Sequence, residues 1–144
     1  MNEITVRNSG WIKISTIKDG FDGTISVAEE FRDIPFKMKR AYYIYNLMNH
    51  EHVIRGKHAH KTLHQVLFCI NGSCSVILDD GTNRQEVELN DPNVGVHIGP
   101  RLWHIMHSFR NNCILLVIAS DIFREEDYIR DYDDFLRYIK SHPA

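Results

Sequence analysis

The chain has 144 residues, the size of one ordinary domain and long enough to bury a substantial core. Its 43% hydrophobic and 25% charged residues are typical of a soluble globular protein. A net charge of −2, with no basic run or interleaved aromatic stripe, argues against binding to nucleic acids or anionic membranes. We therefore expect a single domain over residues 1–144.

The N-terminus and the cysteines predict a cytoplasmic protein. Met1–Val6 lacks the basic region and apolar core of a signal peptide. The longest apolar run, Cys113–Ala119, is the length of a strand and too short to cross a membrane. Cys69, Cys74 and Cys113 are an odd set in apolar runs, which indicates buried reduced thiols rather than disulfides. A zinc site on them is not expected, because the sequence contains no Cys-x-x-Cys spacing.

Short strands separated by turns are predicted along most of the chain. Before residue 55 the sequence predicts strands at Trp11–Ile17 and Thr24–Val27, a turn at Asp19–Gly23, a longer β-rich run at Met38–Leu47 and a polar loop at Met48–Ile54. Later turns are expected at Asn71–Ser73, Asp79–Gly81, Asn90–Asn93, Gly99–Pro100 and Arg110–Asn112. The strands between these turns are Cys74–Leu78, Arg84–Leu89, Val94–Ile98, Leu102–Phe109 and Cys113–Ala119. No alternation of strands with helices competes, so the fold class is an all-β sandwich or barrel.

One amphipathic helix is predicted at the C-terminal end, from about Glu125 to Lys140. Its apolar residues follow helical spacing: Tyr128, Tyr132, Phe135, Leu136 and Ile139. Acidic residues lead the helix and basic residues close it, which suits the helix dipole. We expect its apolar stripe to cover an open face of the barrel.

Histidines gather in the middle of the chain. Five of the nine lie between residues 50 and 64: His50, His52, His58, His60 and His64. His58 and His60 are two residues apart on a predicted strand, so their side chains share one face of the sheet. A single histidine is most often a surface residue, but clustered ionisable groups mark functional sites. The segment Arg55–His60 is therefore the predicted centre of the molecule.

The spacing around this pair resembles the first motif of the cupin barrels, His-x-His-x3,4-Glu-x6-Gly. Here it reads His58-x-His60-x4-Gln65-x6-Gly72, and Pro100–His104 echoes the second motif, Pro-x-Gly-x2-His, without the internal glycine. Metal cupins bind a divalent ion with two histidines, the glutamate and a later histidine. Gln65 brings no negative charge to an ion, so no metal is expected, although three imidazoles would remain as ligands.

A second resemblance is closer. Arg-Gly-x-His-x-His resembles the signature of the nucleotide-sugar cupins, which include the deoxysugar 3,5-epimerases. Five motifs in order resemble the dTDP-4-keto-6-deoxyhexose 3,4-ketoisomerase family over residues 10 to 138: Ile34–Tyr45, Arg55–Lys61, Leu78–Gly81, Trp103–Phe109 and Asp127–Phe135. The resemblance implies an all-β cupin barrel (a double-stranded β-helix or jelly roll) with one C-terminal helix.

The resemblance also implies an isomerase that converts a dTDP-4-keto-6-deoxyhexose to the 3-keto sugar in deoxysugar biosynthesis, without a cofactor. Such an enzyme removes the acidic proton beside the C4 ketone, passes through an enediol and returns a proton at C4. Imidazole suits both steps, because its ordinary pKa of about 6.5 lies near neutral pH. We assign catalysis to His58 and His60 without deciding which of them acts at C3.

Six further side chains are predicted to bind substrate: Arg40, Tyr43, Tyr45, Arg55, His104 and Arg130. Arg55 is expected at the enediolate or the diphosphate, or else in a salt bridge with a barrel carboxylate. Tyr43 and Tyr45 share a strand face, so at least one is expected in the cavity, with core packing as the alternative. His104 is expected to contact a substrate hydroxyl from the opposite wall.

The remaining polar residues receive less specific roles. Arg40 should line the rim of the cavity, and Gln65 should be a buried hydrogen-bonding group. Arg130 is expected to contact the diphosphate, or to pair with Asp127 or Asp134. The other histidines are expected in loops or on the surface: His50, His52, His64, His97, His107 and His142.

Two other functions stay open from the sequence. One is a metal-dependent cupin enzyme using His58, His60, Gln65 and His104, and the other is a sugar-binding cupin without catalysis. The stereochemistry at C4 is also open. The resemblance further implies a homodimer in which N-terminal strands cover the partner's sheet, since exposed β-edges gain by pairing.

Overall fold

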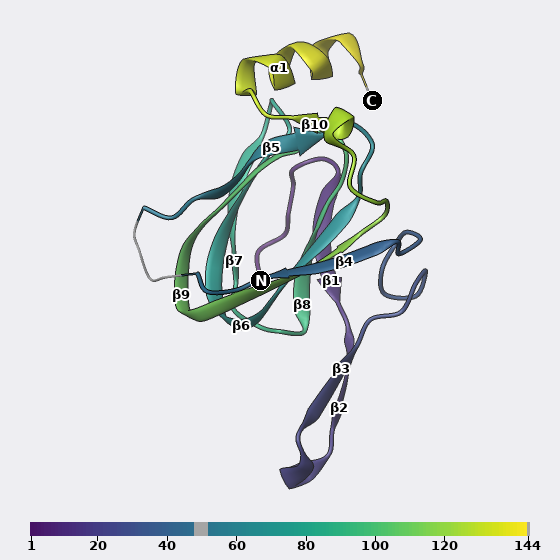
Figure 1. The fold of residues 1–144 in the computed structure, drawn as a ribbon, viewed down its shortest axis with the longest axis vertical. Helices are drawn as coiled ribbons and strands as arrows, with labels where there is room; N and C mark the ends of the chain where they lie inside the picture. Colours follow the sequence, from purple (N-terminus) through teal and green to yellow (C-terminus); the bar gives the residue numbers. More distant parts are fainter. Residues whose placement is uncertain (48–51, 144) are drawn as a thin grey trace.

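The computed structural model describes residues 1–47 and 52–143. Figure 1 shows a curled arrangement of strands with one helix at its end and one hairpin standing away from it. The elements are β1 (Ser9–Lys13), β2 (Ser15–Lys18), η1 (Gly20–Asp22), β3 (Thr24–Val27), β4 (Arg40–Ile44), β5 (Arg55–His60), β6 (Gln65–Asp79), β7 (Arg84–Leu89), β8 (Val94–Ile98), β9 (Trp103–Ala119), η2 (Glu125–Asp127), β10 (Tyr128–Ile129) and α1 (Tyr132–Ser141).

Two long antiparallel strands, β6 and β9, run through the whole barrel (Figure 1). The first part of β6 pairs with β8 and the last part of β9 pairs with β4, with β1 beyond β8. The last part of β6 pairs with β7 and the first part of β9 pairs with β5, with β10 beyond β5. Two curved sheets therefore share the same pair of strands, which confirms the predicted all-β jelly-roll architecture with a C-terminal helix.

The two predicted turns in the middle of β6 and β9 are wrong, because these residues form bulges inside continuous strands. The β6–β9 register shifts at three places between Cys69 and Ser75. Asn111 and Asn112 have positive φ angles of 56°, and Gly72 has a φ angle of 71°. A Cβ atom on Gly72 would lie 2.3 Å from the backbone oxygen of Arg110, so only glycine fits here. Bulges bend both strands, and this bend carries the chain from one sheet to the other.

The C-terminal segment begins its helix later than predicted. Residues 125–127 form a short 3₁₀ turn, and Tyr128–Ile129 then pairs with β5 as strand β10. The helix α1 starts only at Tyr132, where the Asp131 side chain caps it by accepting a hydrogen bond from the Asp134 N–H at 2.9 Å. The helical spacing of the apolar residues is real, but pairing with the edge of β5 satisfies the backbone of residues 128–129 instead.

The apolar side chains form three layers. The largest cluster fills the space between the sheets and includes Leu67, Val76, Leu89, Val96 and Leu115. A second cluster covers the outer face of β6 with Ile34 and Phe36, and a third packs α1 onto the end of the barrel (Figure 1). No helix in the described part of the chain is long and apolar enough to cross a membrane.

The N-terminal strands differ from the prediction of one strand over Trp11–Ile17. The strand β1 joins the barrel beside β8, whereas β2 leaves it and pairs only with β3. The β2–β3 hairpin therefore projects away from the barrel (Figure 1). Its large apolar side chains, Ile17, Phe21 and Ile25, are all exposed.

Shortening Phe135 should destabilise the fold, because its ring is 0% exposed and packs against Trp103 and Tyr132. We expect Phe135→Ala to lower the free energy of unfolding by about 3–5 kcal/mol, through lost burial and the cavity left behind. The control Ile122→Ala removes a side chain that is 54% exposed and should change stability by less than about 0.5 kcal/mol. Urea unfolding measures both, and equal effects would contradict the packing of α1 described above.

Candidate active site

Three imidazoles and one phenol ring meet at the end of the barrel near α1. His58 and His60 come from β5, His104 comes from the neighbouring position on β9, and Tyr128 of β10 lies opposite His60. The His58 ring centroid lies 4.9 Å from that of His60, 4.5 Å from that of His104 and 4.9 Å from that of Tyr128. The structure therefore brings His58, His60 and His104 together, but His104 comes from the strand paired with β5 and not from the opposite wall that the sequence predicted.

The burial of these imidazoles keeps them uncharged. His60 and His104 are each 2% exposed, and His58 is half-buried. Desolvation lowers the pKa of all three below 6.5, and the proximity of His58 lowers the pKa of His60 and His104 further. Near neutral pH each ring is therefore a neutral imidazole with one nitrogen lone pair.

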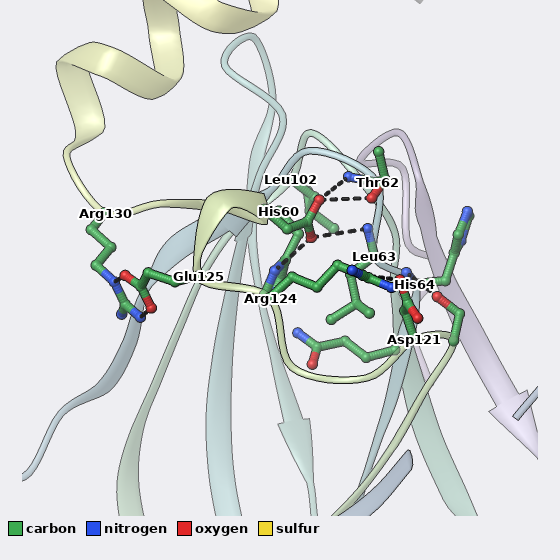
Figure 2. A network of polar contacts seen from close by, with 12 residues as sticks. His60, Thr62, Leu63, His64, Leu102, Asp121, Arg124, Glu125 and Arg130 are labelled. Carbon is green, nitrogen blue, oxygen red and sulfur yellow. Dashed lines mark hydrogen bonds and ion pairs between the residues drawn. The ribbon is translucent and has the colours of Figure 1, made fainter. Parts of the chain in front are cut away.

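The Asp127 carboxylate holds His60 in place. Its Oδ2 atom lies 3.2 Å from His60 Nδ1, and the same carboxylate accepts hydrogen bonds from the Thr62 N–H at 2.8 Å, the Thr62 hydroxyl at 2.7 Å and the Leu63 N–H at 3.2 Å (Figure 2). An ionised carboxylate can only accept, so Nδ1 of His60 is the donor and Nε2 keeps the lone pair. The sequence analysis missed this role, although Asp127 stands in one of the motifs that carry the resemblance.

Gln65 fixes His104 in a similar way, as a buried hydrogen-bonding group. The Tyr42 hydroxyl donates to Gln65 Oε1 at 3.3 Å, which leaves the Gln65 amide to donate to His104 Nε2 at 3.4 Å. His104 Nδ1 then faces the Leu102 carbonyl oxygen at 3.5 Å. The lone pair of His104 is thereby engaged with the amide of Gln65.

These contacts do not suit a metal ion at the histidines. One candidate ligand, His104 Nε2, accepts from Gln65, and Gln65 supplies no charge. Across residues 1–47 and 52–143, the only group of three or more potential ligands with donor atoms within 4.8 Å of one another is Cys69, Cys74 and Cys113. The donor set His58, His60, Gln65 and His104 therefore does not fit the metal-dependent alternative.

A cavity of about 370 Å³ opens beside His58. Three arginines line it, Arg40 from β4, Arg55 from β5 and Arg130 from the segment after β10, together with Tyr42 and Tyr128. The guanidinium of Arg130 lies 4.2 Å from the centre of the Tyr128 ring. A pocket with three cationic side chains next to neutral imidazoles suits an anionic substrate that undergoes proton transfer.

Comparison with known proteins places this arrangement in a family. A profile of the FdtA family, described as WxcM-like, C-terminal, matches residues 7–140. The chain belongs to the FdtA family.

Named relatives of this FdtA family member are sugar-nucleotide isomerases. It is 52% identical over 117 residues to the TDP-4-oxo-6-deoxy-alpha-D-glucose-3,4-oxoisomerase of Aneurinibacillus thermoaerophilus, covering 81% of this chain and 83% of that protein. A mutant of the 3,4-ketoisomerase QdtA from Thermoanaerobacterium thermosaccharolyticum, solved in complex with TDP-4-keto-6-deoxyglucose, superposes with a TM-score of 0.90 at 41% identity, covering 96% and 99% of the two chains. The TDP-quinovose 3,4-ketoisomerase WlaRB of Campylobacter jejuni superposes with a TM-score of 0.85 at 40% identity, covering 92% and 99%.

The prediction for Tyr43 of β4 and for Tyr45, just after this strand, is wrong. Tyr43 and Tyr45 share a strand face, but their side chains are 66% and 58% exposed and line none of the cavity beside His58. Side chains alternate along a strand, so Tyr42 lies on the opposite face and enters that cavity. The pattern of residues gives two faces but does not say which one points inward.

The predictions for several other polar residues also differ from the structure of the FdtA family member. Arg130 pairs with neither Asp127 nor Asp134, but donates two hydrogen bonds of 2.9 Å to Glu125 (Figure 2). His64 and His97 are half-buried rather than on the surface: their rings stack at 2° with 3.0 Å between Nδ1 and Nε2. Arg55 is exposed and forms no salt bridge with a described carboxylate, and His50 lies outside the described residues.

Gly56 should tolerate no side chain. Its φ angle is +82°, and an added Cβ would lie 2.9 Å from the backbone oxygen of His104. We expect Gly56→Ala to lower the free energy of unfolding by about 1–3 kcal/mol, from strain in the left-handed region and from this contact. Gly10→Ala is the matched control, because nothing lies within 4 Å of its added Cβ, and thermal unfolding should separate the two. A Gly56→Ala protein as stable as Gly10→Ala would refute the close approach of β5 and β9.

Proposed function

We propose that the protein is a TDP-sugar 3,4-ketoisomerase, which converts a TDP-4-keto-6-deoxyhexose to the corresponding 3-keto sugar. The observation that carries the proposal is a pair of neutral imidazoles: His58 lines a cavity with three arginines, and the ring of His60 packs against it, with 4.9 Å between the ring centroids. The relatives described above act as 3,4-ketoisomerases, and one of them was solved with TDP-4-keto-6-deoxyglucose bound.

The proposed reaction is an internal transfer of hydrogen. One imidazole removes the proton at C3 and returns it to solvent, and the electrons of that C–H bond form the C3=C4 double bond of an enediol while O4 takes a proton from water. The other imidazole takes the proton of O3 and delivers a proton to C4, which leaves the carbonyl at C3. Atoms and electrons balance within the sugar, so the scheme uses no oxidant, reductant or cofactor.

Asp127 is proposed to prepare His60 for this reaction. Its carboxylate receives the Nδ1 proton, so Nε2 is the nitrogen left for proton exchange with the substrate. The same interaction stabilises the imidazolium that forms when Nε2 takes a proton, because the carboxylate is an adjacent negative charge.

The arginines are proposed to bind the negatively charged part of the substrate. Arg40, Arg55 and Arg130 all line the cavity next to His58, and a diphosphate is an anion that guanidinium groups bind through paired hydrogen bonds. Among the three arginines, Arg55 lies nearest in the chain to His58 and His60, so it also suits the enediolate. His104 lies beside His58 on the paired strand β9 and is 2% exposed, with both ring nitrogens facing protein groups, so no contact with a substrate hydroxyl is proposed for it.

Replacing either catalytic histidine should remove proton transfer and retain nucleotide binding. We expect His58→Asn and His60→Asn each to lower kcat by about 10²-fold or more, because asparagine keeps hydrogen-bonding capacity but exchanges no proton near neutral pH. Their affinity for TDP should change little. An assay of 3-keto sugar formation measures kcat, and calorimetry measures TDP binding. The control is Lys37→Gln, which changes an exposed residue outside the cavity. A kcat close to that of the parent protein in both histidine variants would contradict the assignment of His58 and His60 as catalytic residues.

The pH dependence of the reaction should reflect the burial of His58. The base must be neutral, and burial lowers the pKa of His58 below 6.5. The neutral form therefore persists as the pH falls, and activity is lost only when the pH passes through the lowered pKa. We expect the acidic limb of kcat/KM to have its midpoint below pH 6.5. A midpoint at or above that value would contradict the burial of the base.

A two-fold homodimer is also proposed, in which the β2–β3 hairpin of each chain covers the partner's sheet. The hairpin exposes Ile17 and Ile25, and an apolar groove of about 510 Å³ lies on the outer sheet face beside Phe68, Ile70 and Leu116. Burying these side chains would remove apolar surface from water. We further propose a cytoplasmic location, where the three buried cysteines stay reduced.

The dimer can be tested by mass in solution. We expect light scattering to give twice the chain mass of 16.9 kDa, and the double change Ile17→Asp with Ile25→Asp to shift the mass toward that of one chain. The changes place charges on an apolar contact, which association would have to desolvate. Lys37→Gln should leave the dimer intact. A wild-type mass of 16.9 kDa in both dilute and concentrated samples would refute the dimer.

A further inference from the structure

A second cavity lies on the other side of the turn that precedes His104. It has a volume of about 520 Å³, within the range of pockets that bind small molecules. Its walls come from four separate segments: residues 7–8, the β6–β7 turn at 80–82, residue 101 and the end of α1 with the residues after it. None of its lining residues belongs to the cavity beside His58.

The charge of this second cavity is positive. Arg7, Arg101 and Lys140 line it; Asp80 is the one carboxylate among its lining residues and pairs with Arg7 at 3.5 Å, so Arg101 and Lys140 carry the excess positive charge. Asp80 is buried and already saturated, since it accepts hydrogen bonds from the backbone N–H groups of Arg7, Thr82 and Asn83. Arg101 and Lys140 form no ion pair with any residue in the described ranges.

The wall that carries Arg101 is held in an uncommon conformation. Arg101 and Asn8, which face the same cavity, have positive φ angles of 58° and 60°. Asn8 ties the two segments together: its side-chain amide donates to the Pro100 oxygen at 2.9 Å, and its backbone oxygen accepts from the Gly99 N–H at 2.8 Å. Left-handed backbone is costly for a residue with a long side chain such as Arg101, so these hydrogen bonds help to hold the turn in place. Here it places a free guanidinium at the edge of a pocket.

Part of the lining of this cavity is apolar. Leu136 and Ile139 of α1 contribute it, and the β6–β7 turn approaches so closely that a Cβ on Gly81 would clash with Ile139 Cδ1. A ligand would therefore meet both cationic and apolar side chains. We propose that this cavity is a second binding site, for a phosphorylated small molecule whose phosphate contacts Arg101 and Lys140 and whose less polar part covers Leu136 and Ile139.

The site adjoins the catalytic strand through one hydrogen bond. The Arg101 N–H donates to the backbone oxygen of His60 at 2.7 Å, so the turn that would hold the phosphate is attached to β5. This amide is therefore a reporter for occupancy of the second cavity. The proposal does not rest on the isomerase activity, because no catalytic side chain takes part in it.

Inorganic pyrophosphate is a suitable probe, with amide chemical shifts of the full chain as the measurement. We expect two sets of shifts in the wild type, one around Arg55 and one that includes Arg7, Thr82 and Arg101. The double change Arg101→Gln with Lys140→Gln should lower the pyrophosphate affinity reported by the second set of shifts about tenfold or more, since charge-assisted bonds to phosphate are lost. The affinity reported by the first set should not change. Lys37→Gln is the control for a general loss of positive charge.

The outcomes separate clearly. Amides around the second cavity that do not shift, or that shift equally in the double variant, would overturn this site while leaving the isomerase proposal standing. An equal weakening by Lys37→Gln would also overturn it, because the binding would then be a property of net charge. Arg55→Gln should lower only the pyrophosphate affinity reported by the first set of shifts. Binding at the cavity beside His58 is therefore tested independently of binding at the second cavity.

Discussion

The pairing of β6 with β9 is the constraint on which the rest of the molecule depends. The two strands share residues with both sheets, and bulges near Gly72 and Asn111 bend them from one sheet to the other. Because β9 pairs with β5 before the bend and with β4 after it, the same strand positions His104 beside His58 and brings Tyr42 to the cavity. A change in that register would separate the imidazoles from the arginines.

The site combines two opposite electrostatic requirements. The imidazole proposed as the base must be neutral to accept a proton, and burial favours the neutral form of both His58 and His60. The proposed substrate carries a negative charge, and the arginines proposed to bind it line the cavity beside His58. Asp127 adds a fixed negative charge beside His60. Its carboxylate orients His60 through a hydrogen bond, and three donors from Thr62 and Leu63 hold the carboxylate in place.

The sequence predicted the family, the barrel and the clustering of His58, His60 and His104, because motif spacing and strand alternation are local signals. It failed where pairing between distant segments decides the outcome. Asn-Gly and Asn-Asn favour left-handed backbone, which serves a turn and a bulge equally well, and only the partner strand selects between them. Asp127 lies 67 residues after His60 in the chain, and the pairing of β10 with β5 brings them together. Alternation along β4 could not show that Tyr42 points inward.

Isomerisation of a TDP-4-keto-6-deoxyhexose in deuterated water tests the central claim most directly. Acid–base transfer through an enediol predicts that the 3-keto product carries deuterium at C4, because the proton delivered there comes from an imidazole that exchanges with solvent. His58→Asn and His60→Asn should abolish this product, and the variant that removes the C3 base should also stop exchange at C3 of the substrate. Binding of the sugar nucleotide with no deuterium at either carbon would contradict the account and favour a protein that only senses its ligand.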